Sequence, residues 1–142
     1  MAIIVERRYT HAIHPFHAVV LAGLIPWFLG ATLSDVAYAR SFEIQWSNFA
    51  SWFLVGGLVF GGVALVCALI GLFRADRRAT GGLFYFLVLL AAWVVGFFSA
   101  LMHARDAWAM MPGGLVLSAV TLLLVLVATW LGFRSSHAGV TI

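Results

Sequence analysis

Histidine is the residue type in this chain best suited to chemistry, because its imidazole ring titrates near neutral pH and ligates transition metals and haem iron. Five histidines are present, and three of them fall in the stretch HAIHPFH, as His11, His14 and His17. A fourth, His103, closes a long apolar run, and His137 lies near the end of the sequence. These side chains either bind a cofactor or a metal, or only cap helices and meet lipid headgroups at a membrane surface.

The spacing within HAIHPFH limits what its histidines can bind. His14 and His17 are three residues apart, so on a helix they share a face and cannot lie on opposite sides of one porphyrin. One of them can be an axial ligand of a b-type haem only with a second ligand from another helix. The i, i+3, i+6 series that begins at His11 also allows a copper or zinc site, although Pro15 interrupts a continuous helix before His17.

A second group of polar residues accompanies His103. Ionisable residues at membrane depth are costly and commonly functional, whereas exposed residues near span ends form only weak ion pairs. We expect a solvated rim with local ion pairs; the alternatives are a docking surface for an external partner, or an entrance for a proton or a quinone. The group consists of Asp35, Arg40 and Glu43 after the first apolar run, and His103, Arg105 and Asp106 after the third.

The composition requires that membrane helices position these residues. Hydrophobic residues make up 64% of the 142 positions and charged residues only 9%, whereas soluble domains carry roughly 25% charged residues. A span needs about 20 apolar residues, and four segments qualify: 15–37, 50–73, 82–103 and 114–133. The short connections between them predict an all-α fold, a single transmembrane domain over residues 1–142 built as an antiparallel four-helix bundle.

The arginines predict the orientation of this bundle. The net charge of +3 is small and includes no lysine, so it indicates membrane topology rather than a nucleic-acid surface. The positive-inside rule places both termini in the cytoplasm, with the bundle in a bacterial inner membrane, and MAIIVERR shows no cleavable signal peptide. One side of the membrane collects Arg7, Arg8, Arg74, Arg77, Arg78 and Arg134, and the other has Arg40 and Arg105.

This topology separates the histidines. His17 begins the first span and His103 ends the third, so they are expected at opposite membrane faces, roughly 30 Å apart by helix rise. A single haem between them conflicts with that geometry. Either His14 or His17 pairs with His137 or with a non-histidine ligand, or there are two separate sites.

The second span contains GGLVFGG, residues 56–62. Gly57 and Gly61 form a small-xxx-small pair, which lets a neighbouring helix approach closely. We expect this pair to serve helix packing.

The order of motifs resembles a bacterial membrane-protein family known as domain of unknown function 2231. The motifs are IHPFHAVVLAGLIPWFLGATLSDVAYA, EIQWSNFASWFLVGGLVFGG, ALMHARDAWAMMPGGLVLSAV and TWLGF, and they cover nearly all of the chain beyond residue 10. The resemblance implies a four-helix membrane bundle with a redox role, because members look like companions of Rieske-type, cytochrome c and quinoprotein dehydrogenase domains.

Carried over to this chain, the family's HPxH element falls on His14, Pro15 and His17, and its HARDAW element falls on residues 103–108. The tail departs from the family's His-Gly-Val element, because Ala138 follows His137. That departure puts a role for His137 in doubt.

These observations lead to a principal hypothesis and two alternatives. The principal one is a non-catalytic, b-type-cytochrome-like subunit that passes electrons between a periplasmic dehydrogenase or c-type cytochrome and membrane quinone. In it, His14 or His17 is an axial ligand of haem b, His103 is a ligand or contacts quinone, and Arg105 pairs with a propionate or a partner's carboxylate. The alternatives are a cofactor-free membrane anchor or assembly subunit, and a small metal-binding transport protein.

Overall fold

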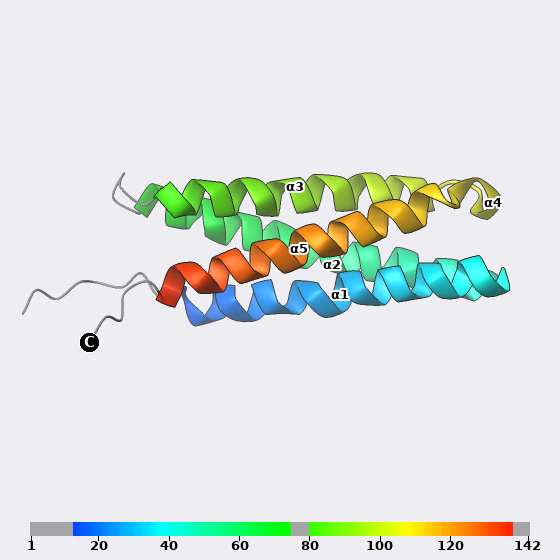
Figure 1. The fold of residues 1–142 in the computed structure, drawn as a ribbon, viewed down its shortest axis with the longest axis horizontal. Helices are drawn as coiled ribbons and strands as arrows, with labels where there is room; N and C mark the ends of the chain where they lie inside the picture. The colour runs from blue at the N-terminus through cyan, green and yellow to red at the C-terminus, as the bar shows by residue number, and fades with distance from the viewer. Residues whose placement is uncertain (1–12, 75–79, 138–142) are drawn as a thin grey trace, which may run out of the picture.

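Four long helices form most of the computed structural model, which describes residues 13–74 and 80–137. They are α1 (Pro15–Ser41), α2 (Ile44–Arg74), α3 (Thr80–His103) and α5 (Gly113–His137), with a short helix α4 (Ala107–Met110) before the last. Each of the four is long and apolar enough to cross a membrane. The predicted all-α fold with four spans is confirmed, and the order of the helices can be followed in Figure 1.

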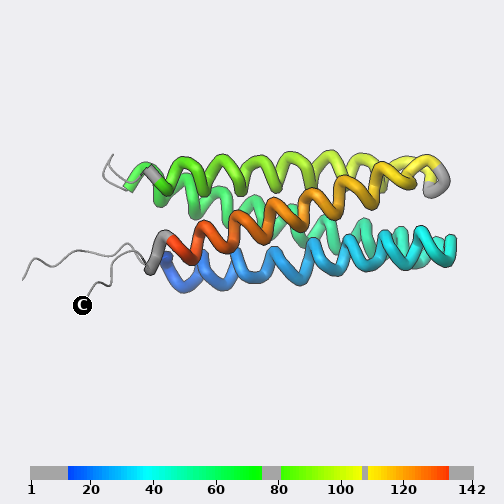
Figure 2. Tube along the Cα trace, in the orientation of Figure 1, coloured from blue at the N-terminus to red at the C-terminus, as the bar shows by residue number. Residues whose placement is uncertain are grey.

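The long helices pack as an antiparallel bundle. Helix α1 packs against α2 and α5, and α3 packs against the same two helices. Helices α1 and α3 run in one direction while α2 and α5 run in the other, as the colours of Figures 1 and 2 show. Helices α1 and α3 therefore face each other across the diagonal of the bundle.

The connection between α1 and α2 is shorter than the sequence suggested. Only residues 42 and 43 separate the two helices, whereas the apolar runs left residues 38–49 between the spans. Phe42 ends α1 in a left-handed conformation (φ 57°), and its N–H donates to Tyr38 O at 2.8 Å. Polar residues near a membrane surface were interpreted as a loop, but the helices continue through them. Asp35 lies well inside α1 and not after the first apolar run.

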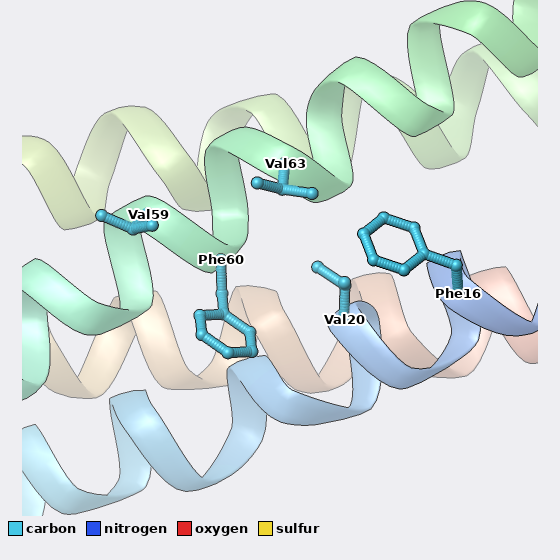
Figure 3. Close-up of a pocket in the computed structure, with 5 residues that line it drawn as sticks. All are labelled: Phe16, Val20, Val59, Phe60 and Val63. Carbon is cyan, nitrogen blue, oxygen red and sulfur yellow. The ribbon is translucent and has the colours of Figure 1, made fainter.

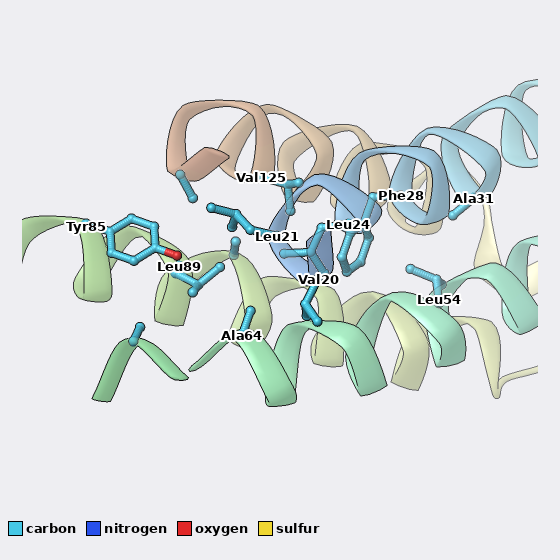
Figure 4. Close-up of a cluster of buried hydrophobic side chains, with 13 residues drawn as sticks. Val20, Leu21, Leu24, Phe28, Ala31, Leu54, Ala64, Tyr85, Leu89 and Val125 are labelled. Carbon is cyan, nitrogen blue, oxygen red and sulfur yellow. The ribbon is translucent and has the colours of Figure 1, made fainter. Parts of the chain in front are cut away.

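The core is a stripe of apolar side chains along the middle of the bundle (Figure 4). On α1, Leu21, Leu24 and Phe28 are at most 1% exposed. A Cβ on Gly57 would lie 2.8 Å from the Phe28 ring, and one on Gly61 would lie 2.9 Å from the Trp93 indole. These glycines admit large side chains from α1 and α3, so the predicted packing role of the pair is confirmed.

Candidate functional site

A buried pair of ionisable side chains crosses the bundle from α1 to α3. Asp35 is 0% exposed, and its Oδ1 lies 2.7 Å from His103 Nε2. Both residues lie on the inward faces of their helices, so the expected solvated rim is wrong for this pair. The remaining members of that group are exposed, as expected of a rim: Arg40, Glu43, Arg105 and Asp106.

Two further groups complete the hydrogen bonds of this pair. His103 Nδ1 donates to Ser99 O at 2.7 Å, because a carbonyl oxygen can only accept. Ser118, on α5, has its Oγ 2.5 Å from Asp35 Oδ2 and 3.1 Å from Leu115 O. Three helices thus supply one connected network, which we call the Asp35 site: Asp35, Ser99, His103 and Ser118.

The Asp35 site lies close to the end of the bundle at which α3 leads into α4, and Figure 1 shows that end. His103 is the last residue of α3, and Ala104 is already exposed. Met110 of α4 is fully buried, and Ser47 of α2 donates a hydrogen bond to its Sδ at 3.6 Å. A Cβ on Gly114 would lie 2.9 Å from Met110 Cγ and 3.1 Å from His103 Cε1. Met110 and the imidazole ring therefore both approach Gly114 of α5.

A second polar pair crosses the bundle near its other end. His17 Nε2 and the Tyr85 hydroxyl are 2.7 Å apart, and both side chains are buried. His17 lies in the first turn of α1 and Tyr85 near the start of α3. A Cβ on Gly132 of α5 would lie 3.1 Å from the Tyr85 ring, so this glycine makes room for the tyrosine.

His14 has a different place from His17. It is the N-cap of α1, and its exposed side chain accepts a hydrogen bond from Phe16 N–H at 3.3 Å. Within the HPxH element, His17 therefore points into the bundle and His14 caps the helix. His11 and the side chain of His137 lie outside the described residues, so their roles stay predictions.

The two cross-bundle pairs have the same spacing along their helices. Eighteen residues separate His17 from Asp35, and eighteen separate Tyr85 from His103. Eighteen residues correspond to roughly five turns and roughly 27 Å of helix, close to the hydrocarbon thickness of a bilayer. The structure thus places His17 and His103 near opposite ends of the bundle, as the topology predicted, and does not bring them together.

The environment of His103 does not fit a ligand of haem iron. Both of its ring nitrogens are already engaged, by Ser99 O and Asp35 Oδ1. Arg105 is exposed, with Nη1 3.8 Å from Met102 Sδ. Within residues 13–74 and 80–137, no group of three or more His, Cys, Asp or Glu side chains could hold a metal ion. Haem ligation by His14 or His17 with a ligand outside these residues stays a prediction.

An apolar groove lies on the outer surface between α1 and α2 (Figure 3). Its volume is about 220 Å³, and only apolar side chains line it: Phe16, Val20, Val59, Phe60 and Val63. Because no polar group lines the groove, it offers contact to lipid chains and no chemistry of its own.

Sequence reasoning missed Ser118 and Tyr85 and assigned Asp35 to a solvated rim. A signal for Asp35 and Tyr85 was present, because each lies five turns from a histidine on its own helix and so shares its face. Ser118 carries no such signal, since only the packing of α5 against α1 brings its hydroxyl to the carboxylate.

Comparison with known proteins gives the family and nothing finer. No curated protein and no solved structure matches the chain. The model of a family described as "Predicted membrane protein (DUF2231)" matches residues 13–140. The match covers the four spans and both cross-bundle pairs, and this chain is a membrane protein that belongs to that family.

Proposed function

We propose that this protein is a membrane subunit that binds and releases a proton at the Asp35 site. The observation that carries the proposal is the Asp35–His103 pair inside two candidate spans. Ionisable residues within spans are expensive to bury, and those that persist commonly belong to ion or proton pathways. A purely structural role needs no titratable groups, because apolar side chains of similar volume stabilise a buried position at least as well.

The number of hydrogens in the Asp35 site supports proton binding. Four contacts join its groups in series: Ser99 O to His103, His103 to Asp35, Asp35 to Ser118, and Ser118 to Leu115 O. An electrically neutral site has three hydrogens for these contacts: one on Nδ1, one shared between Nε2 and Oδ1, and the serine hydroxyl hydrogen.

A fourth hydrogen completes the series. With Asp35 Oδ2 protonated, the carboxyl donates to Ser118 and the serine hydroxyl is free to donate to Leu115 O. The imidazole keeps a hydrogen on each nitrogen, and the charge of the site rises from zero to one positive charge. The site therefore accepts one proton while keeping all four contacts.

The proposal places this proton in an electron-transfer setting. Reduction of a quinone consumes protons at a membrane surface, and a proton-binding group near the end of a bundle is positioned to supply them. The support for a redox setting is the sequence resemblance, with its dehydrogenase and cytochrome companions. Partners on this account are a periplasmic dehydrogenase or c-type cytochrome and the quinone pool.

The same redox function could also be served by a b-type cytochrome, which carries haem. The geometry of the Asp35 site favours this alternative less than a subunit without a cofactor. To ligate iron through Nε2, His103 has to give up Asp35 and leave a carboxylate unpaired inside the bundle. An absorption spectrum of the purified protein, before and after dithionite, distinguishes the two alternatives. Reduced haem bands that vanish in His17→Ala would show that the protein is a b-type cytochrome and not a proton-binding subunit without haem.

The proton-binding proposal is tested by infrared difference spectra of the protein in lipid nanodiscs, recorded between about pH 8 and pH 5, where histidine networks titrate. We expect a change in the carboxyl stretching bands that disappears in Asp35→Asn. His14→Gln, which alters an exposed histidine, is the matched control and keeps the change. Spectra that are the same with and without Asp35 contradict the proposal and leave the cofactor-free anchor as the function.

A further inference from the structure

Two directions along the bundle lead from the Asp35 site to a membrane face, and they differ in how tightly side chains fill them. Toward His17 lies the apolar core, and toward α4 lies the end of the bundle. The difference bears on which membrane face supplies the proton of the proposed function, on which this inference rests.

The direction toward His17 is closed by packing. Leu24, Phe28 and Leu89 are each 1% exposed and belong to one continuous core (Figure 4). The Phe28 ring fills the space that glycines leave on two neighbouring helices, since a Cβ on Gly57 or Gly96 would lie 2.8 or 3.2 Å from it. A water molecule needs room, and the close packing around the Phe28 ring leaves none in this layer.

One polar group of the core, Thr121, is engaged within its own helix, whereas the buried Thr129 hydroxyl, nearer the His17 end of α5, has no hydrogen-bond partner in the part of the chain that the structure describes. Thr121 of α5 is fully buried, and its hydroxyl donates to Leu117 O of its own helix at 2.7 Å. It therefore makes no link to the His17–Tyr85 pair.

The direction toward α4 is short and is covered by a few side chains. Beyond His103 the chain is exposed at Ala104, Arg105 and Asp106. The buried Met110 approaches Gly114 next to the imidazole ring, and the buried Tyr38 lies one turn beyond Asp35 on α1. A methionine side chain is unbranched and flexible, so Met110 can move without disturbing a helix.

The Asp35 site also has an unpaired hydroxyl. Ser99 Oγ is fully buried and has no hydrogen-bond partner within the described residues. It lies one turn before His103 on the same face of α3. Water that passes Met110 would therefore meet a polar group without a partner, which favours its entry.

We propose that the Asp35 site exchanges its proton only with the membrane face that carries α4, through an opening that Met110 closes. The site is then a one-sided proton store rather than a part of a path across the membrane. The titratable and charged groups around it are Tyr38 and Arg40 on α1, Glu43 before α2, and Arg105 and Asp106 before α4; all but Tyr38 are exposed. No such group faces it from the described parts of α2 and α5.

The test is the rate of hydrogen–deuterium exchange at the Asp35 site, read from the carboxyl and imidazole bands of the protein in nanodiscs transferred to D₂O. Met110→Ala shortens the buried side chain next to the site, and we expect exchange to become faster by about tenfold or more, because local opening controls such rates. Met110→Leu keeps an apolar cover and is expected to exchange like the unmodified protein. Met111→Ala, at the neighbouring half-buried methionine, is the matched control and leaves the rate unchanged.

Leu24→Ala tests the opposite direction by creating space in the apolar core. We expect its exchange rate at the Asp35 site to stay within about twofold of the unmodified protein. Faster exchange in Leu24→Ala, or an unchanged rate in Met110→Ala with the helical content preserved, overturns the inference. Failure of the proposed function has a different signature, namely carboxyl bands that are insensitive to pH and to Asp35→Asn.

Discussion

At the scale of single residues, Asp35 carries most of the account. Its carboxyl group is fully buried, yet each oxygen has a side-chain partner on a different helix, His103 on α3 and Ser118 on α5. A buried ionisable group without such partners is strongly destabilising. Removal of any one of these three side chains therefore leaves a buried polar group of another without its hydrogen-bond partner.

Replacement of Asp35 tests this unit. Asp35→Ala leaves the His103 imidazole buried without its partner, and we expect the free energy of unfolding to fall by about 3–5 kcal/mol. Ser118→Ala removes one hydrogen bond to the carboxylate and is expected to cost about 1–3 kcal/mol. Unfolding in detergent, followed by circular dichroism, measures both.

The control for these variants is Glu43→Ala. Glu43 is exposed, so its replacement is expected to change stability by less than about 0.5 kcal/mol. If Asp35→Ala costs no more than Glu43→Ala, the buried network does not form.

At the scale of helices, α2 shows how small residues bring the bundle together. Gly57 and Gly61 face large rings from α1 and α3, and Gly71 on the same helix has no atom within 4 Å of the Cβ that it would carry. The close approach of the helices therefore depends on particular glycines, and Gly71 contributes nothing to it.

Alanine substitutions separate these two kinds of glycine. Gly57→Ala forces the Phe28 ring to move, and we expect a loss of about 1–3 kcal/mol, typical of overpacking. Gly71→Ala meets open space and is expected to leave stability unchanged or to raise it by up to about 1 kcal/mol, because alanine is the better helix former. Thermal unfolding in the same detergent compares them, and equal effects at both positions would contradict the packing described.

Hydropathy and motif spacing predicted the helices well and the polar network poorly. The four spans follow from long apolar runs. The end of α1 and the start of α2 could not be placed, because the last turn of α1 and the first turns of α2 contain polar residues that suit a membrane surface. Asp35 lies within the predicted span of residues 15–37, but its place near the end of that span was assigned to a solvated rim, and its pairing with His103 was missed.

At the scale of the whole molecule, the bundle is apolar in its middle and has a polar pair near each end. The His17–Tyr85 and Asp35–His103 pairs both join α1 to α3, and the apolar core lies between them. This arrangement gives each membrane face its own polar site. The sequence predicted the separation of the two histidines from topology, but it could not predict their partners, which depend on how the helices are rotated in the bundle.

The orientation of the bundle decides which face each site serves. Four spans put residues 15 and 134 on the same side of the membrane, and the arginine distribution predicts that this side is cytoplasmic. A reporter active only in the cytoplasm, fused at the C-terminus, is therefore expected to be active, and the same reporter inserted after residue 105 is expected to be inactive. The opposite pattern would move the Asp35 site to the cytoplasmic face.

The most direct test of the central claim is nitrogen NMR of the protein labelled with ¹⁵N at its histidine side chains, recorded as a function of pH with Asp35→Asn as the comparison. The account predicts that His103 Nδ1 stays protonated throughout, that Nε2 shows a proton shared with Asp35, and that this signal changes together with the carboxyl bands. In Asp35→Asn the shared-proton signal is lost. If the His103 imidazole titrates as a free side chain in the unmodified protein, just as it does in Asp35→Asn, the account is contradicted.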